Sequence, residues 1–196
     1  MKTKFGLMLL LLCCAAMTFA QAKPKAKSTS EHITVAQQMD FLLSGVEREF
    51  VSAADAMPES KYNFAPTNGE FKGVRTFAQQ VKHVAAVNYL VFSDMQGEKP
   101  PANLGGENGP DSMTSKADIM KFLRDSFALG HRTYAAITPQ NQVAPIPNPF
   151  GGKQPSTRVG LAALIIGHCF DHYGQMVEYL RMNGIVPPAS RPQPKK

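Results

Sequence analysis

The sequence predicts an all-α protein, a four-helix bundle whose helices are joined by long connecting loops. Four segments repeat apolar residues at three- and four-residue steps, which is the period of one helix face, and no window alternates apolar and polar residues well enough to indicate a sheet. The chain of 196 residues suits one domain. Amphipathic helices bury their apolar faces most simply against one another, so the four segments are expected to form a bundle.

The first 20 residues read as a signal peptide and not as part of the bundle. Lys2 and Lys4 precede an apolar run at 7–19, which is too short and wrongly flanked for a membrane span. Thr18 and Ala20 place small residues at the −3 and −1 positions of a cleavage site. We therefore expect cleavage after Ala20, export to the periplasm or the medium, and no stable membrane anchor. Residues 21–30 are polar and rich in lysine, which is typical of a flexible linker.

The four helices are predicted in order along the domain, which spans 31–188. Their ranges are 33–57, 74–95, 115–137 and 157–183, joined by connections 58–72, 96–114 and 138–156 that are rich in Pro, Gly and Asn. Pro58 ends the first helix, Ser115 and Thr157 are suited to cap the third and fourth, and Gly184 supplies a left-handed end to the fourth. Residues 189–196 are expected to form a disordered basic tail.

Charge and cysteine content exclude two classes of protein. Lys and Arg number 21 against 15 Asp and Glu, but much of the excess lies in the two terminal tails, so no basic stripe on a folded face indicates a nucleic-acid partner. Of the 3 cysteines, Cys13 and Cys14 lie in the predicted signal peptide and leave Cys169 without an intrachain partner. The chain is therefore not a disulfide-built secreted scaffold.

The candidate site begins with His168 and His172 in the predicted fourth helix. They lie one turn apart and are offset by roughly 40° on an apolar stripe, where an imidazole needs a hydrogen-bonding partner or a metal. The HxxxH spacing alone does not establish a metal site, because histidines that are exposed or packed in a core often share it. Two protein ligands would also leave a transition-metal ion under-coordinated. His83, on an inward stripe of the second helix, is the natural third ligand. In an up-down-up-down bundle, the second and fourth helices run in the same direction and the three histidines lie at similar heights; the long loops permit other topologies.

Neighbouring polar residues have open roles. Asp171 is a possible acceptor for a ligand imidazole or a solvated acid, and Gln175 is a candidate to hold a reacting water, to hold His172, or to make a simple buried hydrogen bond. These two are the only candidates for a catalytic role. His131 is interpreted as a surface or packing histidine, and His32, at the linker junction, has no assigned role. Cys169 lies roughly 100° around the helix from His168 and should miss the site.

The fourth segment resembles the last helix of the DinB/YfiT-like family through His168-x-x-x-His172-Tyr173-Gly174-Gln175 and the run from Tyr179 to Pro188. The stretch 76–89 is similar to the family's second helix, and the resemblance covers roughly 33–188. It implies a four-helix bundle that holds a divalent metal through His83, His168 and His172. It also implies a range of activities, because some members are thiol S-transferases that use bacillithiol or mycothiol and others are maleylpyruvate isomerases. Tyr173 stands where the family often has Arg or another His.

Three functions remain open. The first is an exported metal-dependent enzyme, a hydrolase or a thiol or nucleophile transferase acting on a small substrate of unknown identity. The second is a noncatalytic extracytoplasmic metal- or ligand-binding bundle. The third is a bundle without metal, in which the buried histidines form hydrogen bonds with one another or with nearby backbone. The expected ion is divalent, with Zn or Ni as first candidates and Cu and Fe also accepting imidazole. An exposed apolar face of the bundle is a candidate for homodimer formation.

Overall fold

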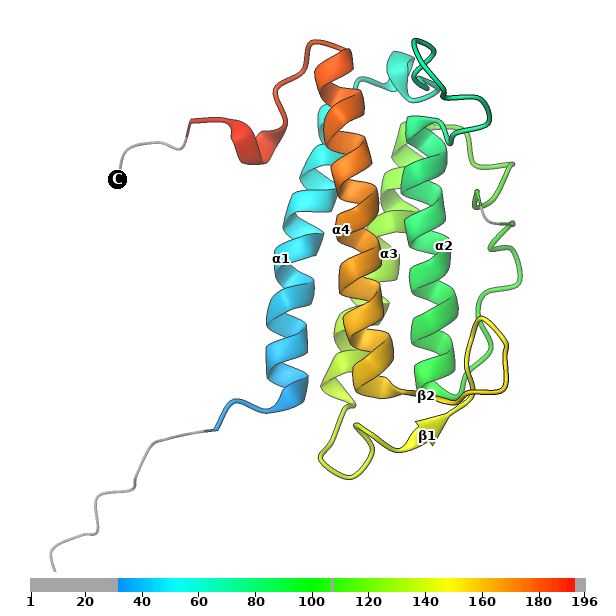
Figure 1. Cartoon of the computed structure of the whole chain (residues 1–196), viewed down its shortest axis with the longest axis vertical. Coiled ribbons are helices and arrows are strands. Elements are labelled where there is room, and N and C mark those ends of the chain that lie inside the picture. The colour runs from blue at the N-terminus through cyan, green and yellow to red at the C-terminus, as the bar shows by residue number, and fades with distance from the viewer. Residues whose placement is uncertain (1–31, 107, 193–196) are drawn as a thin grey trace, which may run out of the picture. The chain divides into compact units, whose positions relative to one another are not determined.

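The computed structural model of the chain describes residues 32–106 and 108–192 (Figure 1). In this part of the chain four α-helices form a bundle, which confirms the predicted fold class. They are α1 (Val35–Ala56), α2 (Phe77–Gln96), α3 (Lys116–Ala135) and α4 (Arg158–Met182), with two short 3-10 helices, η1 (Glu59–Lys61) and η2 (Pro188–Ser190). The signal peptide and linker predicted at 1–30 lie outside the described residues.

Each of the four α-helices begins at a hydroxyl side chain that caps free backbone N–H groups. Thr34 and Thr76 form capping boxes with the glutamine three residues on, while Ser115 and Thr157 accept from one backbone N–H each. The helix limits therefore agree with the predicted ranges to within about three residues, which is the usual uncertainty of helix ends.

The direction of the helices is not up-down-up-down, the topology for which the heights of the histidines were compared. α1 and α4 run one way, and α2 and α3 run the other (Figure 1). Hydrogen bonds from the start and the end of α2 fix its direction relative to α4. Tyr179 Oη donates to the carbonyl of Arg75, and Arg158 Nε donates to the carbonyl of Met95, so α2 and α4 are antiparallel.

α2 and α3 can run in the same direction because the connection after α2 is long. Residues 97–115 can span ~60 Å when extended, about twice the ~30 Å length of α2, so the chain can return along the bundle before α3 begins. α3 consequently starts at the same end as α2.

Two further expectations from the sequence need correction. β1 (Pro145–Ile146) and β2 (Ser156–Thr157) pair as an antiparallel ladder in the last connection, where no sheet was predicted; strands this short cannot show an alternating pattern. The predicted disordered tail starts too early, because Arg181 donates to the hydroxyl of Ser190 and Arg191 donates to the carbonyl of Val186. Residues 193–196 lie outside the described part.

The core lies between the four helices and is densely packed. Phe50 of α1 meets Phe127 of α3 with ring centroids 6.4 Å apart, and Phe92 of α2 meets Tyr134 of α3 edge-on at 5.5 Å. α2 and α3 approach closely at Gly130, where an added Cβ would lie 2.5 Å from the ring of Phe92. No helix among the described residues is long and apolar enough to cross a membrane.

Candidate metal centre

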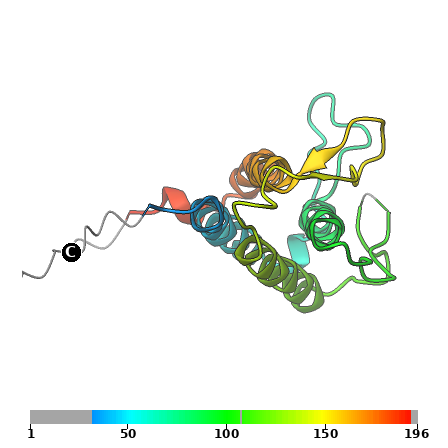
Figure 2. The ribbon, with the colours of Figure 1, turned by 90° about the horizontal axis from the view of Figure 1, so that it is seen from below.

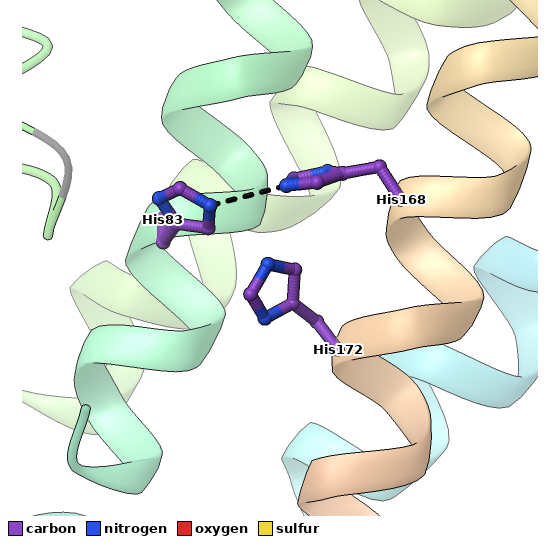
Figure 3. A group of neighbouring side chains, drawn as sticks. All are labelled: His83, His168 and His172. Carbon is purple, nitrogen blue, oxygen red and sulfur yellow. Dashed lines mark hydrogen bonds between the residues drawn. The ribbon is translucent and has the colours of Figure 1, made fainter. Parts of the chain in front are cut away.

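Three histidines from two helices converge inside the bundle. The first turns of α2 cross the middle of α4, and His83 there faces His168 and His172 (Figure 3). One ligand nitrogen from each ring can be chosen so that all three lie within 4.8 Å of one another, and the Nε2 atoms of His83 and His168 are 3.1 Å apart. The structure thus brings together the three residues that the sequence analysis assigned as ligands. Within 32–106 and 108–192, no other group of three His, Cys, Asp or Glu residues is arranged in this way.

The environment of His168 and His172 keeps their imidazole rings neutral. Burial, and after it the neighbouring imidazoles, lower the pKa of His168 to about 3. Burial and His83 lower the pKa of His172 to about 4, and only 6% of the surface of His172 is exposed. Both rings are therefore uncharged at neutral pH, and each carries a nitrogen lone pair, which is the form of histidine that binds a metal.

The geometry of the rings fits a divalent ion. Two imidazole nitrogens that bind one ion at ~2.0–2.1 Å lie roughly 2.9–3.4 Å from each other in tetrahedral or octahedral geometry. The 3.1 Å separation of the two Nε2 atoms falls within this range. His83, His168 and His172 are therefore suited to hold such an ion, and a set of three imidazoles leaves further coordination positions for other ligands.

A chain of hydrogen bonds, here called the amide relay, orients His172. It consists of Asp171, Gln175 and Gln80. Gln175 Nε2 donates to Asp171 Oδ2 at 3.2 Å, Gln80 Nε2 donates to Gln175 Oε1 at 2.8 Å, and His172 Nδ1 lies 2.5 Å from Gln80 Oε1.

The carboxylate of Asp171 sets the direction of the whole relay, because a carboxylate can only accept hydrogen bonds. Gln175 must turn its amide nitrogen to Asp171 and its oxygen to Gln80, and Gln80 must then turn its oxygen to His172. His172 consequently carries its proton on Nδ1, and Nε2 keeps the lone pair that a metal needs. Such outer hydrogen bonds commonly fix the tautomer of a ligand histidine.

The relay changes the roles assigned from the sequence. Asp171 and Gln175 are linked to His172 through Gln80, which the sequence analysis did not single out. Gln80 lies three residues before His83 and so faces the same side of α2, a spacing that was visible in the sequence. The Nδ1 atom of His168 is buried and has no hydrogen-bond partner among the described residues.

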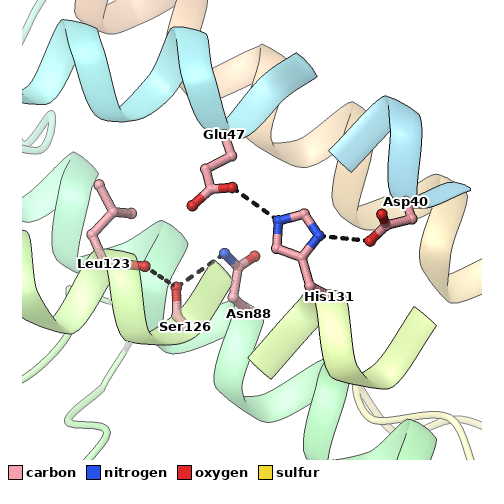
Figure 4. Close-up of polar contacts among 6 residues, drawn as sticks. All are labelled: Asp40, Glu47, Asn88, Leu123, Ser126 and His131. Atoms are coloured by element: carbon pink, nitrogen blue, oxygen red, sulfur yellow. Dashed lines mark hydrogen bonds and ion pairs between the residues drawn. The ribbon is translucent and has the colours of Figure 1, made fainter. Parts of the chain in front are cut away.

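His131 lies away from this site and links α1 to α3, in agreement with its interpretation as a surface or packing histidine (Figure 4). Its Nδ1 is 2.6 Å from Asp40 and its Nε2 is 2.9 Å from Glu47. Burial alone lowers the pKa of His131, but the hydrogen bonds and charges of the two carboxylates outweigh it, so the pKa lies above the ordinary 6.5. Cys169 is fully buried and turned to Asn88, so it does not join the metal centre.

A cavity of about 370 Å³ opens beside His83 and His168. Its other described lining residues come from α2 and from the two long connections after α2 and α3: Ala86, Val87, Leu90, Leu104, Gly105, Gly106 and Phe150. Figure 2 shows the connection after α2, and the later, yellow part of the connection after α3, on the side of the bundle that faces away from α1. The volume lies within the range of small-molecule sites, so a small ligand can reach the histidines.

Comparison with known proteins places the chain in a family. The model of the DinB superfamily matches residues 42–176, a range that contains all three histidines. A DinB-like protein from Bacillus cereus ATCC 10987 has a similar fold, with a TM-score of 0.58 and 17% identity over 79% of this chain and 93% of that one. None of the curated proteins that were compared matches the chain. With a family match over more than half of its length, the chain belongs to the DinB superfamily.

Proposed function

We propose that this protein is an exported metal-dependent enzyme that hydrolyses a small substrate, or transfers a thiol or another nucleophile to it, at a centre formed by His83, His168 and His172. The observation that carries the proposal is the meeting of three imidazoles, two of which, those of His83 and His168, line a cavity large enough for a small molecule. A divalent ion at this position would act as a Lewis acid, lowering the pKa of a water or thiol that binds it, or polarising a carbonyl. Export rests on the leader-like residues 1–20.

The chain's own residues would prepare the site in two ways. Burial keeps the imidazoles of His168 and His172 neutral by lowering their pKa values, so that no proton competes for their lone pairs near pH 7. The amide relay holds His172 in one tautomer and one orientation. None of the described residues that line the cavity is an acid or a lysine that could act as a general base, so catalysis would rely on the ion and on substrate positioning.

That lack of a general base is also the reason to retain a second candidate, a noncatalytic metal-binding module. In this case the ion would join α2 to α4 and stabilise the bundle, because it binds the folded chain and not the unfolded one. Zn and Ni are the first candidates for the ion in either function.

Elemental analysis of the purified chain tests the proposed centre. We expect one equivalent of a divalent metal in the wild type and in the His131→Ala control, which removes a histidine outside the centre. The triple variant His83→Ala, His168→Ala, His172→Ala should hold none, and equal metal content in all three preparations would exclude the site. Turnover by the loaded protein on ester, amide and thiol-transfer substrates, absent from the triple variant, would separate the enzyme from the structural module.

A further inference from the structure

We propose that the cavity beside His83 and His168 binds the apolar body of the substrate, and that the polar, reacting end of the substrate lies at the histidines. This inference rests on the proposed function and specifies its substrate class. The ligand would be a small molecule with an aliphatic or aromatic part of up to about a dozen non-hydrogen atoms, if each occupies roughly 30 Å³ of the 370 Å³ cavity.

One face of α2 carries both the metal ligand and the apolar floor of the cavity. Ala86, Val87 and Leu90 follow His83 at three, four and seven residues, which is the spacing of one helix stripe. A molecule that lies along this stripe therefore reaches the imidazole of His83 at one end and contacts only hydrocarbon at the other.

The roof of the cavity is also apolar. Leu104 comes from the connection after α2, and Phe150 comes from the connection after α3. Phe150 leaves 53% of its surface exposed, so a bound apolar group would cover an aromatic ring that otherwise faces water. Apart from the two histidines, no described side chain lining the cavity is polar, and none is charged. The described part of the wall is therefore suited to an apolar body.

The part of the roof that comes from the connection after α2 is held in place before any ligand binds. Lys82, which precedes His83 and is only 7% exposed, donates from Nζ to the carbonyls of Pro110 at 2.8 Å and Met113 at 3.3 Å. Gly109 packs directly on this lysine, because an added Cβ would lie 2.5 Å from Lys82 Cβ. The connection that supplies Leu104 is therefore fastened to α2, and a preformed cavity binds its ligand without a further ordering cost.

A pair of metal-binding probes tests the inference. Acetohydroxamate and benzohydroxamate present the same chelating head, but only the second carries a ring that can enter the cavity. Each is titrated into the cobalt-substituted protein, and binding is followed by the visible spectrum of the cobalt ion. We expect benzohydroxamate to bind at least tenfold more tightly than acetohydroxamate.

Variants locate the source of this preference. Leu104→Asp and Phe150→Asp should each reduce it to less than threefold while acetohydroxamate binds as before. Phe41→Asp replaces an exposed phenylalanine on α1 that does not line the cavity, and it should keep the preference.

Equal affinity for the two probes in the wild type, or a preference that survives both cavity variants when their melting temperatures are normal, would overturn the inference and leave the metal centre standing. A chain that takes up no cobalt would instead refute the proposed function, and the inference would fall with it.

Discussion

Gln80→Leu is the sharpest single test of how the centre is built. Leucine keeps much of the bulk of the side chain but removes the oxygen that receives the proton of His172 Nδ1. The ring of His172 then loses the group that holds its tautomer and its orientation, and Nε2 no longer keeps its lone pair toward His83 and His168. We expect the affinity for the divalent ion to fall.

The magnitude follows from the number of hydrogen bonds lost. Gln80 is 1% exposed and makes one hydrogen bond to His172 and one to Gln175. Loss of an outer hydrogen bond to a ligand histidine typically lowers metal affinity ~10–100-fold, equivalent to about 1.4–2.7 kcal/mol. The metal-free protein should also lose about 1–3 kcal/mol of stability, because His172 Nδ1 is left buried without an acceptor.

Competition against a chromophoric chelator measures the affinity, and thermal unfolding of the metal-free variant measures the stability. Gln175→Leu is the graded comparison: it removes the side chain that links Gln80 to Asp171 but leaves the bond between Gln80 and His172, so the affinity should fall less than in Gln80→Leu. A folded Gln80→Leu protein that binds the ion as tightly as the wild type would refute the relay as the support of His172.

Three other predictions concern the bundle and its loops. His131 has a raised pKa in the folded state, so the stability that it contributes, about 1 kcal/mol, is fully present below pH 6.5 and is lost as the pH rises through the folded-state pKa. Urea unfolding of the wild type and of His131→Gln between pH 5.5 and 9 should show that the difference between their free energies of unfolding shrinks as the pH rises. A difference that stays constant would contradict this. Gly130→Ala should lower the stability of the fold by about 1–3 kcal/mol, because the added Cβ would meet the ring of Phe92. Gly45→Ala, in open space on α1, should raise the stability by up to ~1 kcal/mol. Thermal melts in which both changes shift the stability in the same direction would contradict the packing. Lys82→Met removes the two hydrogen bonds that hold the connection after α2. Backbone amides in 97–114 should then exchange faster with deuterium, while those of α3 keep their protection. Unchanged exchange would show that the lysine does not hold the connection.

Helix positions could be predicted from this sequence because local signals agree with one another. Thr157 begins α4 where the apolar period begins, and Gly184, with φ 72°, follows its end where a left-handed residue is needed. The direction of α2 relative to α4 had no such signal. It depends on the path of the connection after α2, which is held by the buried amine of Lys82 and by the close approach of Gly109. Neither contact has a pattern in the sequence.

The candidate ligands could be predicted, but for a reason that was partly wrong. The heights of His83, His168 and His172 were compared for parallel helices, whereas α2 and α4 are antiparallel. The rings still meet because His168 and His172 lie near the middle of α4, where α2 passes close to it in either direction. The role of Gln80 could not be predicted, because it depends on three side chains from two helices bonding in sequence.

The most direct test of the central claim is a crystal structure of the metal-loaded chain with data collected on both sides of the metal absorption edge. The account predicts one anomalous peak between α2 and α4, at about 2.0–2.1 Å from a nitrogen of each of His83, His168 and His172 if the ion is zinc. A strong peak at any other place, or one that contacts only the two histidines of α4, would contradict it.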